Sequence, residues 1–218
     1  MLGKAARLSL TSLFAALTAA CAQLQFKLGP VPYTMQNFAV MLAGLTLRPR
    51  YAALSQLMYL LLVAAGAPAA AGLRGGPAAL TGHTAGYLWM FPVSSLLMSC
   101  LSRAYAAKRP GALLNPTLRD RAALLLLSLA AALPMYAAGF LVLCYHALQP
   151  TALGEGLSAW SGAVAAALGL RGLGRLQALF VASVLIFIPQ DLLVDHLLAV
   201  LVASRVLRYM SEAGLEVP

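Results

Sequence analysis

Charged residues are scarce in this sequence of 218 residues. They make up 10% of the chain, and only 6 residues are acidic, whereas about 25% of a typical soluble domain is charged. The apolar class reaches 61%, above the usual ~45–50%. Such a chain has too few polar side chains to cover a water-facing surface, so its surplus apolar residues must face lipid. The composition argues against an ordinary soluble enzyme, a disordered chain, a coiled coil and a collagen-like repeat.

Cysteines and catalytic motifs are equally scarce. Cys21, Cys100 and Cys144 stand alone in apolar runs, without CxxC or HxxxH spacing. This pattern predicts buried thiols, and neither a metal site nor a disulfide framework. The sequence also lacks a Walker loop, HExxH, GxGxxG and a nucleophile elbow. We therefore expect no enzyme, no cofactor and no ATP hydrolysis of the P-loop type.

Long apolar runs predict an all-α polytopic membrane protein with a single domain, residues 1–218. The hydrocarbon core of a bilayer takes about 20 helical residues, and Gly/Pro-rich or basic stretches separate the runs. Six transmembrane helices are expected, over residues 8–25, 35–47, 51–65, 84–101, 122–148 and 176–207. The N-terminal run is interpreted as a retained first helix rather than a signal peptide.

Prolines modify three of these runs. Pro92 and Pro134 predict kinks within their helices, and Pro189 predicts a break in the last run. After that break, residues 190–208 are long enough to cross the membrane alone. Residues 158–188 are then expected to form an outer-surface or half-inserted helix before the last span.

Positive charge predicts the orientation. With six spans, the termini and two connections share one side, and that side carries 11 of the 15 Lys and Arg residues, against 4 on the other. The positive-inside rule then places both termini in the cytoplasm. A seventh span would move Arg205 and Arg208 outside, against this rule. The asymmetry also explains most of the net charge of +9, so no nucleic-acid partner is expected.

Asp191 and Asp195 lie in an otherwise apolar run. A carboxylate inside a bilayer is costly and usually marks a ligand or ion path, and a spacing of four places both on one helix face. Because Pro189 suits the first turn of a helix, Asp191 is expected near the positive end of the helix dipole. The structural alternative is a capping carboxylate at the interface. His196 is a candidate proton relay.

The stretch Thr81–Tyr87 opens the fourth run from its outer side. Glycines such as Gly86 let the backbone approach a ligand closely. His83, Thr84 and Tyr87 add hydrogen-bonding groups, and Tyr87 adds a ring for stacking. These residues are therefore substrate-binding candidates, with helix capping as the structural alternative for His83 and Thr84.

The first two runs carry further candidates. Gln36 begins the second run, where its amide must find a partner in lipid, and the binding pocket is one option. Ala15, Ala16, Ala19 and Ala20 form two overlapping small-xxx-small pairs in the first run, a pattern that lets another helix approach closely. In an alanine-rich chain this pattern also arises by chance.

Four motifs in order resemble one known family. The sequence of Val31–Gly44 resembles the VPxTxQxxxVxLAG signature of the BioY family, and Tyr59–Pro68 resembles its YLLLGxxGxP stretch. Leu80–Phe91 resembles LxGPTGGYLxGF, and Phe187–Asp191 resembles FxPGD. BioY proteins are the biotin-binding S components of energy-coupling factor (ECF) vitamin transporters.

The resemblance implies a six-helix protein of a prokaryotic cell membrane that captures biotin on its outer side. It implies docking on a transmembrane coupling subunit driven by two ATP-hydrolysing subunits, and the paired alanines match the docking motif. The family aspartate of the biotin pocket maps to Asp191. Tyr59 joins the substrate-binding candidates through its motif. Biotin's ureido ring offers two N–H donors, which suit a carboxylate.

Departures from the family pattern leave the ligand open. The family continues as PGDxxK, but its lysine falls on Val194, next to Asp195. Arg74 and Lys27 are the available cations on the outer side, and Arg74 is taken as a substrate-binding candidate. The alternatives are an S component for another vitamin, a solitary biotin transporter, and a membrane enzyme that uses Asp191 and Asp195, with His83, as acid/base groups.

Overall fold

The N-terminal part of the chain contains three helices and one short β-hairpin, which lies between the first and the second helix. The computed structural model describes residues 4–27 and 29–214. Strands β1 and β2 pair antiparallel, with Phe26 opposite Tyr33. The elements of this part are α1 (Lys4–Cys21), β1 (Gln25–Lys27), β2 (Pro32–Thr34), α2 (Gln36–Thr46) and α3 (Pro49–Ala64).

The second half contains the longest helices. A 3₁₀ turn (Pro77–Leu80) leads into the short α4 (Ala85–Trp89), and the long helices follow: α5 (Phe91–Lys108), α6 (Leu118–Leu148) and α7 (Ala152–Ala167). The last helix runs unbroken from Arg175 to Glu212. It comprises α8 (Arg175–Phe180), a π-helical segment (Val181–Leu185), α9 (Phe187–Gln190), a second π-helical segment (Asp191–His196) and α10 (Leu197–Glu212).

The expected break at Pro189 is wrong. Pro189 lacks an N–H, and its ring would clash with the carbonyl of Leu185 in a regular α-helix. One turn earlier the helix widens, where the N–H of Ile186 donates to Val181 in an i to i−5 hydrogen bond of 3.1 Å. Such π-type turns are frequent at functional sites. Asp191 therefore lies well inside the helix and not near its N-terminus.

The expectation for a second proline also changed. The expected kink at Pro92 is a break, because α4 ends at Trp89 and Pro92 occupies the first turn of α5. Pro134 lies within α6, which continues from Leu118 to Leu148 as expected, and the kink there stays a prediction. The expected outer helix over residues 158–188 is also divided differently, since α7 ends at Ala167 and the last helix already begins at Arg175.

Small side chains allow the helices of the centre to approach closely. α5 packs against α2 and α3, and α2 also packs against α10. A Cβ added to Gly44 of α2 would stand 2.6 Å from the Cβ of Met98 on α5. Four serines of α5 are buried, and they are Ser94, Ser95, Ser99 and Ser102. This small-residue contact is typical of helices that pack within a membrane.

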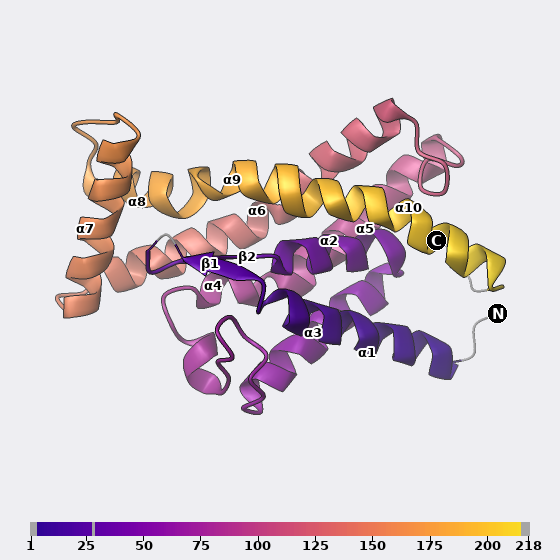
Figure 1. Cartoon of the computed structure of the whole chain (residues 1–218), viewed down its shortest axis with the longest axis horizontal. Coiled ribbons are helices and arrows are strands. Elements are labelled where there is room, and N and C mark those ends of the chain that lie inside the picture. The colour runs from indigo at the N-terminus through magenta and orange to yellow at the C-terminus, as the bar shows by residue number, and fades with distance from the viewer. Residues whose placement is uncertain (1–3, 28, 215–218) are drawn as a thin grey trace.

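The outer surface of the bundle is apolar. Leu126 and Leu141 of α6 are 66% and 65% exposed, and many other leucines point outward with them. α6 and the last helix are each long and apolar enough to cross a membrane. Figure 1 shows that α1 begins and α10 ends at one end of the molecule, while the β-hairpin and α7 lie toward the other. Six spans and the orientation stay predictions.

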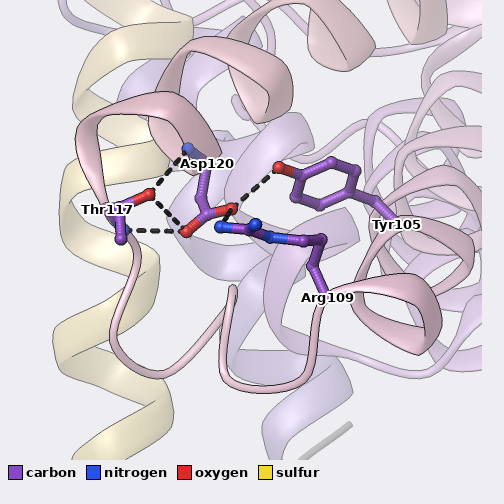
Figure 2. A network of polar contacts seen from close by, with 4 residues as sticks. All are labelled: Tyr105, Arg109, Thr117 and Asp120. Atoms are coloured by element: carbon purple, nitrogen blue, oxygen red, sulfur yellow. Dashed lines mark hydrogen bonds and ion pairs between the residues drawn. The ribbon is translucent and has the colours of Figure 1, made fainter.

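A network of polar contacts closes the connection between α5 and α6 (Figure 2). Asp120 lies in the first turn of α6. Its carboxylate accepts hydrogen bonds from the hydroxyl and the N–H of Thr117 at 2.6 and 2.9 Å and from the Tyr105 hydroxyl at 2.8 Å, with Arg109 at 3.3 Å. These contacts, led by the Thr117 hydroxyl, hold the pKa of Asp120 well below its usual range. Asp120 precedes the apolar stretch of α6, which begins at Ala122.

Candidate functional site

A cavity lies among β2, α2, the 70–79 loop, α4, α5, α6 and the last helix. Five of the predicted substrate-binding residues line it, and they are Gln36, Arg74, Thr84, Tyr87 and Asp191. Its other walls come from Val31, Pro32, Thr34, Asn37, Ala70, Ala71, Ala79, Leu88, Phe91, Met135, Tyr136 and Phe187. Most of these are apolar, with a few polar groups among them, as in most small-molecule sites.

Asp191 is the one acidic residue among the cavity residues, and it is 2% exposed. Its Oδ2 accepts a hydrogen bond of 2.6 Å from the Tyr136 hydroxyl of α6, and the Asn37 side chain also hydrogen-bonds to it. Three elements thus fix this carboxylate, because Asn37 belongs to α2. The arrangement holds a hydrogen-bond acceptor rigidly at the cavity wall, where it can receive N–H donors of a solute.

Gln36 is oriented by two neighbours. Its Nε2 donates to the Tyr59 hydroxyl at 2.7 Å, and its Oε1 accepts from the Thr34 hydroxyl at 3.0 Å. Tyr59 is fully buried and does not line the cavity, so its connection with the cavity is the hydrogen bond to Gln36. The amide of Gln36 is thereby held with a defined face toward the cavity.

Aromatic rings form one wall of the cavity. Phe187 stacks on Tyr33, with ring centroids 4.2 Å apart, and Tyr33 stacks on Phe26 at 4.7 Å. The Tyr87 ring lies tilted to Phe187 at 6.5 Å, and its hydroxyl donates to the Ser183 carbonyl at 2.6 Å. That carbonyl belongs to the first π-helical segment. The Tyr87 hydroxyl is therefore used within the fold, and its ring faces the cavity.

His83 and Gly86 lie outside the cavity lining. The Nε2 of His83 is 3.0 Å from the carbonyl of Pro30, to which it donates. A Cβ on Gly86 would stand 2.2 Å from the carbonyl oxygen of Ala138. This glycine therefore allows α4 to approach α6 closely. Thr84 lines the cavity, although its side chain makes no capping hydrogen bond.

Asp195 lies one turn beyond Asp191 and outside the cavity. It is fully buried, and its oxygens lack hydrogen bonds of normal geometry, with Gln190 and the Phe38 backbone as the nearest polar groups. The side chain of His196 faces elsewhere and lies 3.0 Å from the Ser128 hydroxyl. Val194, the position of the family lysine, is 45% exposed. The expected pair of site carboxylates is thus reduced to Asp191.

Arg74 is the cationic residue that the structure brings to the cavity. Its Nε donates to the Ala71 carbonyl at 3.0 Å, and its backbone pairs with Ala70. The side chain is exposed, which places it at the solvent side of the cavity. Lys27, the other candidate cation, is exposed on β1 and does not line the cavity.

The two alanine pairs of α1 point in different directions. Ala15 is buried against the bundle and Ala19 is half-buried, whereas Ala16 and Ala20 are exposed. Leu13 is exposed beside them. Of the two pairs, Ala16 and Ala20 are therefore the residues that another helix can contact.

Sequence reasoning missed the two residues that hydrogen-bond to Asp191. Asn37 follows Gln36 directly within the Val31–Gly44 motif, and this neighbourhood was a usable signal. Tyr136 stands in the long apolar run of α6, where its hydroxyl was a weaker signal. Their contact with Asp191 became visible only in the structure.

A helical bundle with an apolar exterior, and with a cavity that presents fixed acceptors, defines a membrane protein that binds a small solute. The sequence shows to which family of proteins this chain belongs. Residues 2–212 match the BioY family, and the chain belongs to that family.

Relatives and one solved structure agree with this assignment. The chain is 47% identical over 94 residues to "Probable biotin transporter BioY" of Pyrococcus horikoshii, which covers 43% of this chain and 58% of that protein. It is 54% identical over 70 residues to the Bacillus subtilis protein of the same name, covering 32% and 38%. These matches therefore span about half the length of the curated relatives or less.

The fold agrees over a longer range. A crystal structure described as the S-component for biotin from an ECF-type ABC transporter superposes with a TM-score of 0.70 over 94% of both chains, at 20% identity. This likeness confirms the all-α fold.

Proposed function

We propose that the protein is the substrate-capture (S) component of an ECF-type transporter and that it binds biotin on the outer face of the cell membrane. The observation that supports this function most directly is the polarity of the cavity. A buried carboxylate, Asp191, lies at one part of its wall, a solvent-side guanidinium, Arg74, lies at another, and apolar or aromatic residues form most of the rest.

The ureido ring of biotin fits the buried part. Its two N–H groups are donors that match Asp191, and its carbonyl is an acceptor that matches the Asn37 amide, which has a second N–H donor besides the one it can give to Asp191. A solute with this neutral ring leaves the carboxylate hydrogen-bonded rather than stripped of partners, which matters in a site that excludes water. The aromatic wall with Phe187 suits the apolar remainder of the solute.

The carboxylate of biotin fits the solvent side. Arg74 supplies a planar cation that binds carboxylates through two hydrogen bonds. In this proposal Arg74 takes over the charge of the missing family lysine, and Lys27 does not contribute. Biotin would then lie with its ring inside and its acid group toward the solvent.

In this proposal the ATP hydrolysis that drives uptake comes from partner subunits, since the sequence contains no Walker loop. We infer that the exposed pair Ala16 and Ala20 on α1 docks against the transmembrane coupling subunit, which works with two ATP-hydrolysing subunits. Small residues allow a close helix contact. Both termini lie on the cytoplasmic side in this arrangement, and the six spans are retained.

An S component for a different vitamin is the second candidate, and the valine at position 194 favours it, since the lysine of the family pattern is absent there. A solitary biotin transporter is compatible with the same cavity. An acid/base enzyme is not supported, because Asp195 and His83 lie outside the cavity that holds Asp191.

Equilibrium binding of labelled biotin to the purified full-length protein tests the proposal. We expect saturable binding below micromolar concentrations, with no competition by thiamine or riboflavin. Absence of biotin binding in this range would reject biotin as the ligand, and tight binding of another vitamin would favour the second candidate.

A further inference from the structure

The turn of the β-hairpin is held from two sides by residues that do not line the cavity. Gly29 and Pro30 lie in this turn, between β1 and β2. Figure 1 shows the hairpin at the end of the bundle that carries α7. The side chains that reach the turn come from α7 on one side and from the loop before α4 on the other.

Trp160 of α7 supplies the first contact. A Cβ added to Gly29 would stand 2.2 Å from the indole Nε1 and 2.7 Å from Cδ1, so the ring lies directly on the glycine backbone. Gly29 also has φ +135, a conformation that other residues rarely adopt. The turn therefore fits under the indole only with glycine at this position.

His83 supplies the second contact. Its Nε2 donates to the Pro30 carbonyl over 3.0 Å. The two contacts act on consecutive residues of the turn. An indole on one residue and an imidazole on the next restrict the turn far more than either contact alone.

The turn leads directly into the wall of the cavity. Val31, Pro32 and Thr34 follow it and line the cavity. Tyr33, between them, is stacked between Phe26 and Phe187. A displacement of the turn would therefore move one wall of the cavity.

Hydrogen bonds and buried contacts fix the position of α7 beside the hairpin. The Thr151 side chain caps its first turn by accepting from the Gly154 N–H at 3.1 Å. Arg175, at the start of the last helix, donates to the Ser158 hydroxyl at 2.8 Å and to the Ala147 carbonyl. Leu157 of α7 is buried. Trp160 is thus carried by a helix that is tied to both α6 and the last helix.

We propose that Trp160 and His83 are positioning residues that clamp the β-hairpin over the cavity and so control the passage of the ligand in both directions. The proposal rests on the proposed function only in its choice of ligand. Loops that close over a site commonly limit the rates of binding and release.

The rates of biotin association and dissociation test the clamp. In the full-length protein, Trp160→Ala and His83→Ala should each raise the dissociation rate at least about tenfold and the association rate at least about threefold. Opening a gate speeds passage both ways, whereas damage to the binding groups speeds release alone. Trp160→Phe should lie between wild type and Trp160→Ala. Leu153→Ala, which truncates an exposed side chain of the same helix, is the matched control and should change neither rate.

A second measurement needs no ligand. Amide hydrogen exchange over residues 25–34 should become faster in Trp160→Ala and not in Leu153→Ala. If this exchange is unchanged, or if only release becomes faster, the clamp is wrong. If wild type fails to bind biotin, the proposed function fails, and the exchange measurement alone then decides on the clamp.

Discussion

Replacing Asp191 with asparagine is the sharpest test of the site. The substitution keeps the size of the side chain but removes one of its two acceptor oxygens and the negative charge. Tyr136 already uses Oδ2 at 2.6 Å. The remaining oxygen and charge are what the ureido N–H groups of biotin would use, and the new NH₂ group is a donor that would face them.

The expected loss follows from hydrogen-bond energies. A hydrogen bond to a charged group contributes about 1.5–3 kcal/mol, so the loss of one such bond weakens binding roughly 10- to 150-fold. The assay is equilibrium binding of labelled biotin to purified wild type and Asp191→Asn. Asp195→Asn is the matched control, because it makes the same change one turn away, at a buried residue outside the cavity.

Two results would refute the reasoning. If Asp191→Asn keeps the wild-type Kd within about threefold, the carboxylate is not the acceptor of the ureido ring. If Asp195→Asn weakens binding as much as Asp191→Asn does, the effect is a general one on the last helix and not a contact with the ligand.

Further predictions concern the solvent side of the cavity, a helix cap and the docking surface. Arg74→Ala should weaken the binding of biotin at least about tenfold but leave that of biotinamide, which lacks the carboxylate, nearly unchanged; Lys27→Ala should affect neither ligand in the same assay, and an equal loss for both ligands contradicts the proposal. Because the pKa of Asp120 is lowered in the folded state, its stabilisation is present above the unfolded pKa of about 4 and is lost as the pH falls toward the lower, folded value. Asp120→Asn should therefore lower the Tm at pH 7, with a difference from wild type that narrows below about pH 4; a difference independent of pH would reject this. Ala16→Leu and Ala20→Leu should abolish co-purification with the coupling subunit while the Kd for biotin is kept, and intact co-purification would remove the docking surface from α1.

Much of the site could be predicted because polar groups are so rare in this chain. Asp191, Gln36 and Tyr87 stand out in apolar runs, and the structure brings all three to one cavity. The same reasoning included Gly86 and Asp195, which the structure leaves outside it. A glycine can be needed for the close packing of two helices as well as for the approach of a ligand to the backbone. A buried carboxylate can lie one helical turn beyond the residues that line the cavity.

The choice between Arg74 and Lys27 could not be made from sequence. Both are basic residues that fall on the predicted outer side near motifs resembling those of the family, and neither has a periodic signal. The pairing of Arg74 with Ala70 turns the 70–74 loop toward the cavity, whereas Lys27 stays exposed on β1. The structure decided between them because it places the 70–74 loop beside cavity residues that lie far away in the chain.

The sequence by itself determined the family, indicated a membrane protein and singled out Asp191 as a site candidate, because composition and ordered motifs are properties of the chain alone. Tertiary structure decided how the last helix passes Pro189, since a π-type turn depends on the packing around it. It also decided which partners hold Asp191 and which alanines of α1 face outward. Those features depend on contacts between helices that lie far apart in the sequence, and local propensity does not predict such contacts.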